Sequence, residues 1–166
     1  MDARLERVLS AEPTFTGDAG GPCPPGFHRL RLERWAGTGD QVFERAAARV
    51  LSWQVLRQAG LRIDATAERP EPGTTVLQRL GPVQAPCRVA TVVREPRRAG
   101  FSYLTLPGHA ERGVEQFMVE HRDDNSVWCV VSSISRPEAW YARLGGPAGR
   151  LVQQLMVRRY LAAMAG

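Results

Sequence analysis

The sequence contains no lysine, so all 22 of its basic side chains are arginines. Exclusive use of arginine indicates a compositional bias of the genome more than selection for contacts with phosphate groups. The formal net charge is +5, and most of it lies near the C-terminus. From Arg136 onward there are five arginines and a single acid, Glu138, which is a net charge of +4. Basicity is therefore a local property of the last segment.

Cysteine and histidine are scarce and scattered. The three cysteines, Cys23, Cys87 and Cys129, form no CxxC pair and are odd in number, which excludes a disulfide framework and a zinc knuckle. Reduced thiols in a cytosolic protein are the expectation, with Cys129 buried in an apolar strand. His28, His109 and His121 lie far apart, so we expect neither a metal site nor a cofactor.

Long hydrophobic runs are also missing. The longest in the second half, at 127–131, is too short to cross a bilayer as a helix. The N-terminus, MDARLERVLSAEP, carries charges where a signal peptide needs an apolar segment. Hydrophobic residues make up 43% of the 166 residues, which suits one globular domain over 1–166. The sequence predicts a soluble, cytoplasmic protein that does not span a membrane.

The first part of the chain predicts an arm, a strand and a helix. Residues 1–26 begin like a short helix and continue as an irregular, Gly- and Pro-rich arm. A strand is expected over 27–35. A helix follows to about Ala59, with a capping box at Thr38 and Gln41 and a stop at Gly60. Val42 replaces the third glycine of a dinucleotide-binding loop, which argues against phosphate binding at this turn.

Alternating patterns then predict a run of antiparallel strands and a closing helix. The strands are expected at 75–80, 87–94, 100–106, 115–122 and 127–135, with a hairpin turn at 123–126. The last helix runs from about Pro147 to Ala165, with an apolar sector that includes Val152, Leu155 and Ala163. This order predicts an α+β fold in which a curved antiparallel sheet wraps around the C-terminal helix.

Two polar residues fall in apolar sectors of these helices. Gln54 is either a core glutamine bonded to the backbone or a polar group that lines a cavity. Arg159 either extends its guanidinium to solvent at the helix end or meets an anion, such as Glu115 or a ligand carboxylate.

The segment 100–117, GFSYLTLPGHAERGVEQF, combines an aromatic strand with a polar turn. Phe101, Tyr103 and Thr105 point to one side of the strand, which the turn at Pro107-Gly108 ends. His109 and Glu115 follow within a few residues. The segment is either a site or a polar hairpin tip.

The order of elements is similar to the helix-grip fold of the Bet v 1, START and polyketide-cyclase-like superfamily. That resemblance implies a ligand cavity between the sheet and the closing helix. It implies no particular function, because one fold serves many functions. The sequence also resembles a narrower uncharacterised family, domain of unknown function nineteen-ninety, along nearly its whole length. The matching residues are Pro25-Gly26-Phe27-His28, Gly37-x-Gly39, Phe43, Ala46, Ser52-Trp53-Gln54, Arg57, Ala59, Gly60, Gly73 to Val76, Arg88-Val89, Gly100-Phe101-x-Tyr103-x-Thr105-Leu106-Pro107-Gly108-His109, Gly113, Glu115, Phe117, Ser135-Arg136-Pro137, Gln153 and Tyr160.

Three positions depart from that family's usual pattern. Leu104 stands where the family usually has glycine, Val114 where it has an acid, and Leu56 where it has histidine. The family brings no known activity with it, and these departures weaken a catalytic interpretation more than a binding one.

Three functions remain open on the sequence alone. The first is binding of a small apolar or amphipathic molecule in a mostly apolar cavity. Its expected lining residues are Trp53, Gln54, Phe101, Tyr103, Thr105, His109, Glu115, Phe117 and Arg159.

The second is a cyclase, dehydratase or hydrolase that uses acid–base chemistry. His109 would be the general base, Glu115 would orient it and Tyr103 would donate a proton. The third is an interaction module that uses the Arg-rich C-terminal helix. Few aromatics accompany those arginines, so no specific nucleic-acid binding is predicted.

Overall fold

The computed structural model describes residues 3–166, so the first two residues of the expected N-terminal arm lie outside the described part. Its twelve elements follow in chain order. They are α1 (Ala3–Val8), β1 (His28–Thr38), α2 (Asp40–Val50), α3 (Gln54–Gln58), β2 (Arg62–Ala65), β3 (Thr75–Leu80), β4 (Val83–Glu95), β5 (Arg98–Thr105), β6 (Glu111–His121), β7 (Ser126–Pro137), α4 (Trp140–Leu144) and α5 (Gly146–Ala165).

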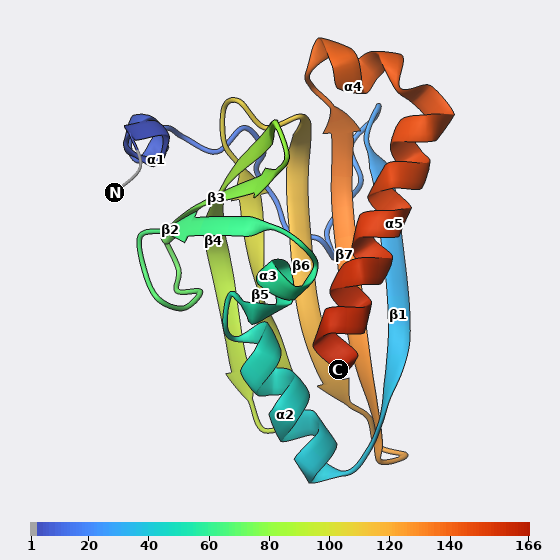
Figure 1. Cartoon of the computed structure of the whole chain (residues 1–166). Helices are drawn as coiled ribbons and strands as arrows, with labels where there is room; N and C mark the ends of the chain where they lie inside the picture. The colour runs from blue at the N-terminus through green and yellow to red at the C-terminus, as the bar shows by residue number, and fades with distance from the viewer. Residues whose placement is uncertain (1–2) are drawn as a thin grey trace.

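The seven strands form one curved antiparallel sheet in the order β1-β7-β6-β5-β4-β3-β2. Helices α2, α3 and α5 lie across one face of this sheet, with α5 running along the β1–β7 side (Figure 1). This is the expected helix-grip architecture, and the α+β prediction is confirmed. Short turns between consecutive strands produce the meander. At the β6–β7 hairpin Asn125 takes a positive φ of 68° and the carboxylate of Asp124 accepts the amide of Ser126 at 3.0 Å.

An aromatic chain fills the space between the sheet and the three helices. Phe101 on β5 and Phe117 on β6 stack with their ring centroids 5.0 Å apart. Trp53 meets Phe101 edge-on at 5.9 Å, and Tyr160 of α5 meets Phe117 edge-on at 5.1 Å. Edge-to-face and offset contacts at these distances stabilise by about 0.5–1.5 kcal/mol each beyond burial. The core therefore centres on the C-terminal half of α5, which contains Tyr160.

The N-terminal arm packs on the opposite face of the sheet. Phe15 and Ala19 cover Val114 and Ile134 in a second apolar cluster. Arg88 holds the start of the arm, because its guanidinium donates to the carbonyl oxygens of Val8 at 3.1 Å and of Ala11 at 2.7 Å. No helix or strand forms between Val8 and His28, a segment rich in glycine and proline.

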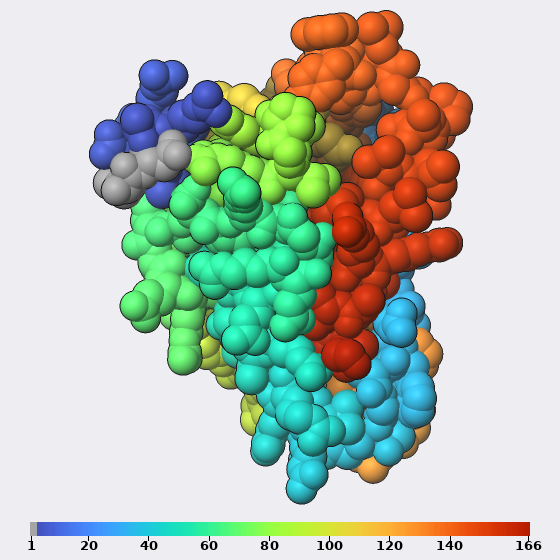
Figure 2. Space-filling view, viewed as in Figure 1, coloured from blue at the N-terminus to red at the C-terminus, as the bar shows by residue number. Residues whose placement is uncertain are grey.

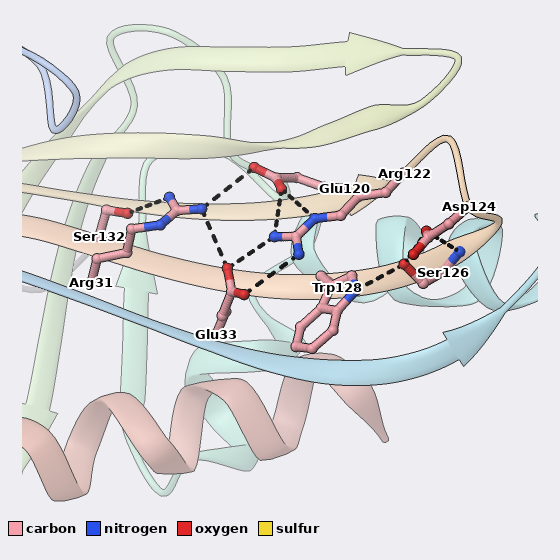
Figure 3. A network of polar contacts seen from close by, with 8 residues as sticks. All are labelled: Arg31, Glu33, Glu120, Arg122, Asp124, Ser126, Trp128 and Ser132. Carbon is pink, nitrogen blue, oxygen red and sulfur yellow. Dashed lines mark hydrogen bonds and ion pairs between the residues drawn. The ribbon is translucent and has the colours of Figure 1, made fainter.

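A charged network crosses strands β1, β7 and β6 on the face turned away from α5 (Figure 3). Arg122 donates to Glu33 at 2.9 Å and to Glu120 at 3.1 Å, and its guanidinium lies 4.8 Å from the ring centre of Trp128. These groups are partly exposed, so each ion pair contributes at most about 1 kcal/mol. The network links side chains of three neighbouring strands on the face that the helices leave uncovered.

Several expected boundaries were wrong. The single helix to Ala59 is broken at Leu51–Trp53, where Ser52 donates its hydroxyl to the carbonyl of Arg49 at 2.9 Å. The capping box at Thr38 and Gln41 does not form, because Gly39 is the N-cap and no side chain caps this helix. Strands β4 and β6 begin four residues earlier than expected, and β2 and α4 were not expected.

The buried face of α5 also differs from the expected sector. Its buried residues all lie in the C-terminal half, and they are Val157, Tyr160, Leu161, Ala163 and Met164. Val152 and Leu155, which were expected to be buried, are exposed. Helix α5 contacts the core only over its last turns, and its first half extends over the upper sheet (Figure 1). Of the helices between residues 3 and 166, none has the length and apolar content needed to cross a bilayer.

Candidate functional site

A cavity of about 270 Å³ lies between the first half of α5 and the upper part of the sheet. Apolar side chains of the β3–β4 hairpin and α5 form most of its wall, and among them are Leu80, Val83, Val152 and Met156. Figure 2 shows a recess between the yellow-green β3–β4 hairpin and the orange start of α5. The cavity is present because only the C-terminal half of α5 is buried against the core, whereas its first half does not fill the space above this end of the sheet.

The polar floor of the cavity comes from three adjacent strands. Tyr103 on β5 is directly opposite Glu115 on β6, and Glu115 is directly opposite Ser133 on β7. The phenol of Tyr103 donates a hydrogen bond of 2.5 Å to the carboxylate of Glu115. The hydroxyl of Ser133 is buried and has no hydrogen-bond partner among residues 3–166. An unused hydroxyl next to a carboxylate leaves capacity for a further polar group.

The surroundings of Glu115 change its protonation behaviour. Enclosure by apolar protein atoms raises the pKa of Glu115 to about 7, against an ordinary value of 4.5, although the hydrogen bond from Tyr103 opposes this shift. Burial and the nearby Glu115 carboxylate raise the pKa of Tyr103 well above its usual range. The same two causes raise the pKa of Tyr160, whose side chain also lines the cavity. The carboxyl is therefore the group in this cluster that changes charge near neutral pH.

His109 lies at the rim, after the Pro107-Gly108 turn. Its Nδ1 accepts a hydrogen bond of 2.9 Å from the amide of Glu111. Desolvation lowers the pKa of His109 to about 4, so the ring is neutral at neutral pH. Because Nδ1 is an acceptor, the single ring proton is on Nε2. His109 can therefore donate one hydrogen bond into the cavity.

Helix α5 is tied to the rim by one side chain. The amide nitrogen of Gln153 lies 3.3 Å from a carboxylate oxygen of Glu111 and 3.2 Å from the hydroxyl of Ser135. On the opposite wall, the Gln78 amide contacts the sulfur of Cys87 at 3.6 Å. These two glutamines place amide groups on two walls of the cavity, one on β3 and one on α5.

Four of the nine residues expected to line a cavity do so: Tyr103, Thr105, His109 and Glu115. Trp53, Phe101 and Phe117 are instead packed in the aromatic core, and the Trp53 indole donates to the carbonyl of Ala67 at 2.9 Å. The Phe101 and Phe117 rings lie on the same face of the sheet as Tyr103, but they pack under the C-terminal half of α5, where Tyr160 meets Phe117.

The other two expected residues, Gln54 and Arg159, are exposed. Gln54 begins α3 and reaches neither the core nor the cavity. The guanidinium of Arg159 lies outside the cavity, beside Gly60 at the end of α3. An internal ion pair between Arg159 and Glu115 is therefore excluded.

The proposed orientation of His109 by Glu115 is also replaced by other contacts. Glu115 is bonded to Tyr103, and the Nδ1 of His109 is bonded to the backbone of Glu111. With its pKa near 4, His109 is a weak base, and Glu115 is the better proton acceptor of the two.

Sequence reasoning did not identify Gln78, Glu111, Ser133, Gln153 and Tyr160 as lining residues. Ser133 could have been found from the hairpin register, since it is the partner of Glu115 in the β6–β7 ladder. Glu111 could have been found from strand alternation, since it lies four residues before Glu115 on the same strand. Gln153 gave a weaker signal, because a polar residue one turn before Met156 and Val157 is common on any helix.

The described cysteines and acids are not grouped as metal ligands. Cys87 and Cys129 are buried, and Cys23 is exposed. Burial raises the pKa of the Cys129 thiol to about 12, which makes it unreactive as a thiolate. Within residues 3–166 no group of three or more His, Cys, Asp or Glu side chains is arranged to hold a metal ion.

Residues 11–163 match the family described as Domain of unknown function (DUF1990). A relative named UPF0548 protein, from Deinococcus radiodurans, is 32% identical over 149 residues, which cover 81% of this chain and 73% of the relative.

Solved structures share the fold at low sequence identity. A hypothetical protein from Helicobacter pylori superposes with a TM-score of 0.63 at 10% identity, over 86% of this chain and 90% of that one. The major latex-like protein 151 of Panax ginseng, a Bet v 1-like protein, gives 0.56 at 13% identity, over 82% and 97%. At this identity the likeness establishes the fold alone.

Proposed function

Because this chain belongs to the DUF1990 family, whose description assigns no activity, its function is argued from its own cavity, and we propose that it binds a small, largely apolar molecule there. The observation that carries the proposal is the open, apolar-walled cavity with a cluster of polar groups at one end. Pockets of this composition hold ligands by apolar contact and orient them by a few polar groups.

The polar groups are suited to orientation. Tyr103 and Glu115 are fixed by their mutual hydrogen bond, while Ser133 has no partner among the described residues. The apolar body of a ligand would lie against Val83, Val152 and Met156. The Bet v 1-like fold of the ginseng protein supports the proposal only by analogy of architecture.

A cavity-filling substitution tests this function. Ala85 lines the cavity on β4, so Ala85→Trp should occupy the space and weaken binding of prodan, an uncharged environment-sensitive dye, by roughly tenfold or more. The measurement is a fluorescence titration of the full chain. Ala148→Trp on the exposed side of α5 is the matched control and should leave the dissociation constant unchanged.

Two results would contradict the cavity as the binding site. One is equal binding by the wild type and Ala85→Trp with both folded, which would place the dye on the outer surface. The other is a wild type that shows no saturable binding at all.

A second candidate function rests on the exposed surface of α4 and the start of α5, and we propose that it docks on an anionic lipid surface. Trp140 is 74% exposed and Leu144 is 79% exposed, with Tyr141 and Leu151 also exposed beside them. Large apolar side chains gathered this way mark an interaction surface. Arg143 and Arg150 lie in the same two helices, and residues 139–166 contain four arginines and no acid.

This charge distribution distinguishes between two possible partners of the surface, a second copy of the chain and an anionic membrane. A second copy docked face to face would bring four arginines together, Arg143 and Arg150 of each copy, without an acid from these two helices, which disfavours a symmetric dimer. Interfacial aromatic residues with arginines instead suit an anionic membrane surface.

Vesicle co-sedimentation tests this docking. The wild type should bind vesicles of phosphatidylglycerol and phosphatidylcholine roughly tenfold more than pure phosphatidylcholine, and Trp140→Ser should reduce that binding several-fold. Trp35→Ser, at an exposed tryptophan on β1, is the matched control. Equal binding to both vesicle types, or a dimer in solution that Trp140→Ser dissociates, would overturn the proposal.

A further inference from the structure

The cavity has a pronounced charge asymmetry. Its lining contains two carboxylates, Glu111 and Glu115, and no arginine, although the chain has 22 arginines and no lysine. His109 also lines it, and its lowered pKa leaves that ring uncharged at neutral pH. Among residues 3–166 the formal charges on the cavity wall are therefore all negative. The nearby surface of α5, in contrast, carries only positive charges.

From this arrangement we propose that the ligand is an apolar molecule with a protonated amine at one end, held by Glu115 at the cavity floor. This inference rests on the proposed binding function and specifies its ligand class. A carboxylate in an apolar enclosure is costly unless a cation or several donors accompany it. Glu115 receives one donor, from Tyr103, and has no basic partner among the described residues. An ammonium group would supply the missing counter-charge.

The other floor groups can satisfy an ammonium. An ammonium has three donors and needs acceptors. Glu115 supplies one through the oxygen that Tyr103 leaves unused, and the unpartnered hydroxyl of Ser133 on the adjacent strand supplies a second. An anionic ligand would bind poorly, because the Tyr103 phenol already donates its proton to Glu115 and the Glu115 carboxylate would repel a second negative charge. The same cavity therefore attracts a cation and rejects a fatty acid.

Titration of Glu115 makes binding depend on pH. Its pKa is raised to about 7 in the free protein, so a bound ammonium would stabilise the ionised form and lower that pKa. The titratable groups that face it are Tyr103 on β5, Tyr160 on α5, Cys87 on β4 and Glu111 on β6. The raised pKa values of the two phenols and the thiol keep them neutral near neutral pH.

Three matched probes test the ligand class: 3-phenylpropylamine, 3-phenylpropanol and 3-phenylpropanoate. Calorimetric titration of the full chain at about pH 8, where Glu115 is ionised and the amine is protonated, should give the tightest binding for the amine. We expect the amine to bind at least roughly tenfold tighter than the carboxylate, with the alcohol between them. At about pH 5.5 the amine should bind roughly tenfold more weakly, because Glu115 becomes protonated.

Three variants assign the preference to Glu115. Glu115→Gln should bind the amine and the alcohol equally and lose the pH dependence. Tyr103→Phe retains the carboxylate and should keep the preference for the amine. Glu44→Gln, an exposed residue of α2, makes the same change in net charge and should behave as the wild type.

The outcomes separate this inference from the proposed function. Equal binding of all three probes, or tightest binding of the carboxylate, would overturn amine recognition and leave the cavity as a binding site. An amine preference that survives in Glu115→Gln would also overturn it. Absence of binding by any probe, together with absence of prodan binding, would overturn both.

Discussion

Gly100→Ala is expected to destabilise the protein by about 3 kcal/mol or more, or to prevent folding. A Cβ atom at position 100 would lie 2.0 Å from the carbonyl oxygen of Phe117 and 2.9 Å from the Cα of Met118. Both are backbone atoms of the neighbouring strand β6, so a side-chain rotation cannot relieve the clash. Strand β6 would have to move away from β5.

Movement of β6 would disturb the core directly. Gly100 pairs with Met118, and the adjacent pair, Phe101 and Phe117, stacks in the centre of the aromatic chain. Separation of these strands would weaken that stack and the ladder hydrogen bonds around it. A single methyl group at this position therefore acts on the largest buried cluster.

Urea unfolding monitored by tryptophan fluorescence measures the effect, and Gly149→Ala is the matched control. At Gly149 the nearest atom to an added Cβ is 3.9 Å away, and the residue lies in α5. Alanine should be neutral or stabilising there by up to about 1 kcal/mol. A Gly100→Ala protein as stable as the wild type would show that the β5–β6 approach is looser than described.

The meander of strands could be predicted from the sequence because alternation and turn residues are local signals. The β6–β7 turn at Asp124-Asn125 illustrates this, since aspartate accepts a nearby amide and asparagine tolerates positive φ. Short elements were missed for the same reason. Strand β2 has four residues and α4 has five, too few for a period to be recognised.

The cavity lining could be predicted only in part, because it depends on where α5 leaves the sheet. Phe101, Tyr103 and Thr105 share one face of β5, but Phe101 lies in the core and the other two line the cavity. Helical periodicity predicts which residues share a side of α5. It does not predict that the side is covered at Val157 and open at Val152.

The Tyr103–Glu115 pair was within reach of the sequence. A β5–β6 hairpin centred on His109 places residue 103 opposite residue 115, and that is the observed register. The expected partner of Glu115 was His109 because the two are close in sequence. Residues of a hairpin turn lie beyond the last cross-strand pair, so proximity along the chain did not give proximity of side chains.

Glu115→Gln and His109→Asn should change the pH dependence of stability in opposite directions. The pKa of Glu115 is raised from 4.5 to about 7, so its stabilising contribution is complete below about pH 4.5 and is lost as pH rises through 7. The pKa of His109 is lowered from 6.5 to about 4, so its contribution is complete above about pH 6.5 and is lost as pH falls through 4. At about 1.4 kcal/mol per pH unit, each is worth up to about 3 kcal/mol, less whatever water in the cavity recovers by solvation.

In the wild type these two contributions oppose each other between about pH 4.5 and pH 6.5, so their slopes largely cancel. A substitution that removes one titrating group leaves the pH dependence of the other group visible. Glu115→Gln should gain stability as pH rises through this range relative to the wild type, and His109→Asn should lose it. Asparagine keeps an acceptor near the Glu111 amide, which limits structural loss. Urea unfolding at several pH values measures both profiles, and Glu44→Gln should follow the wild type because its carboxylate is exposed. Parallel profiles for the two cavity variants would mean that the carboxyl and the imidazole titrate as they do in water, and the cavity floor would then be solvated and could not discriminate between charged ligands.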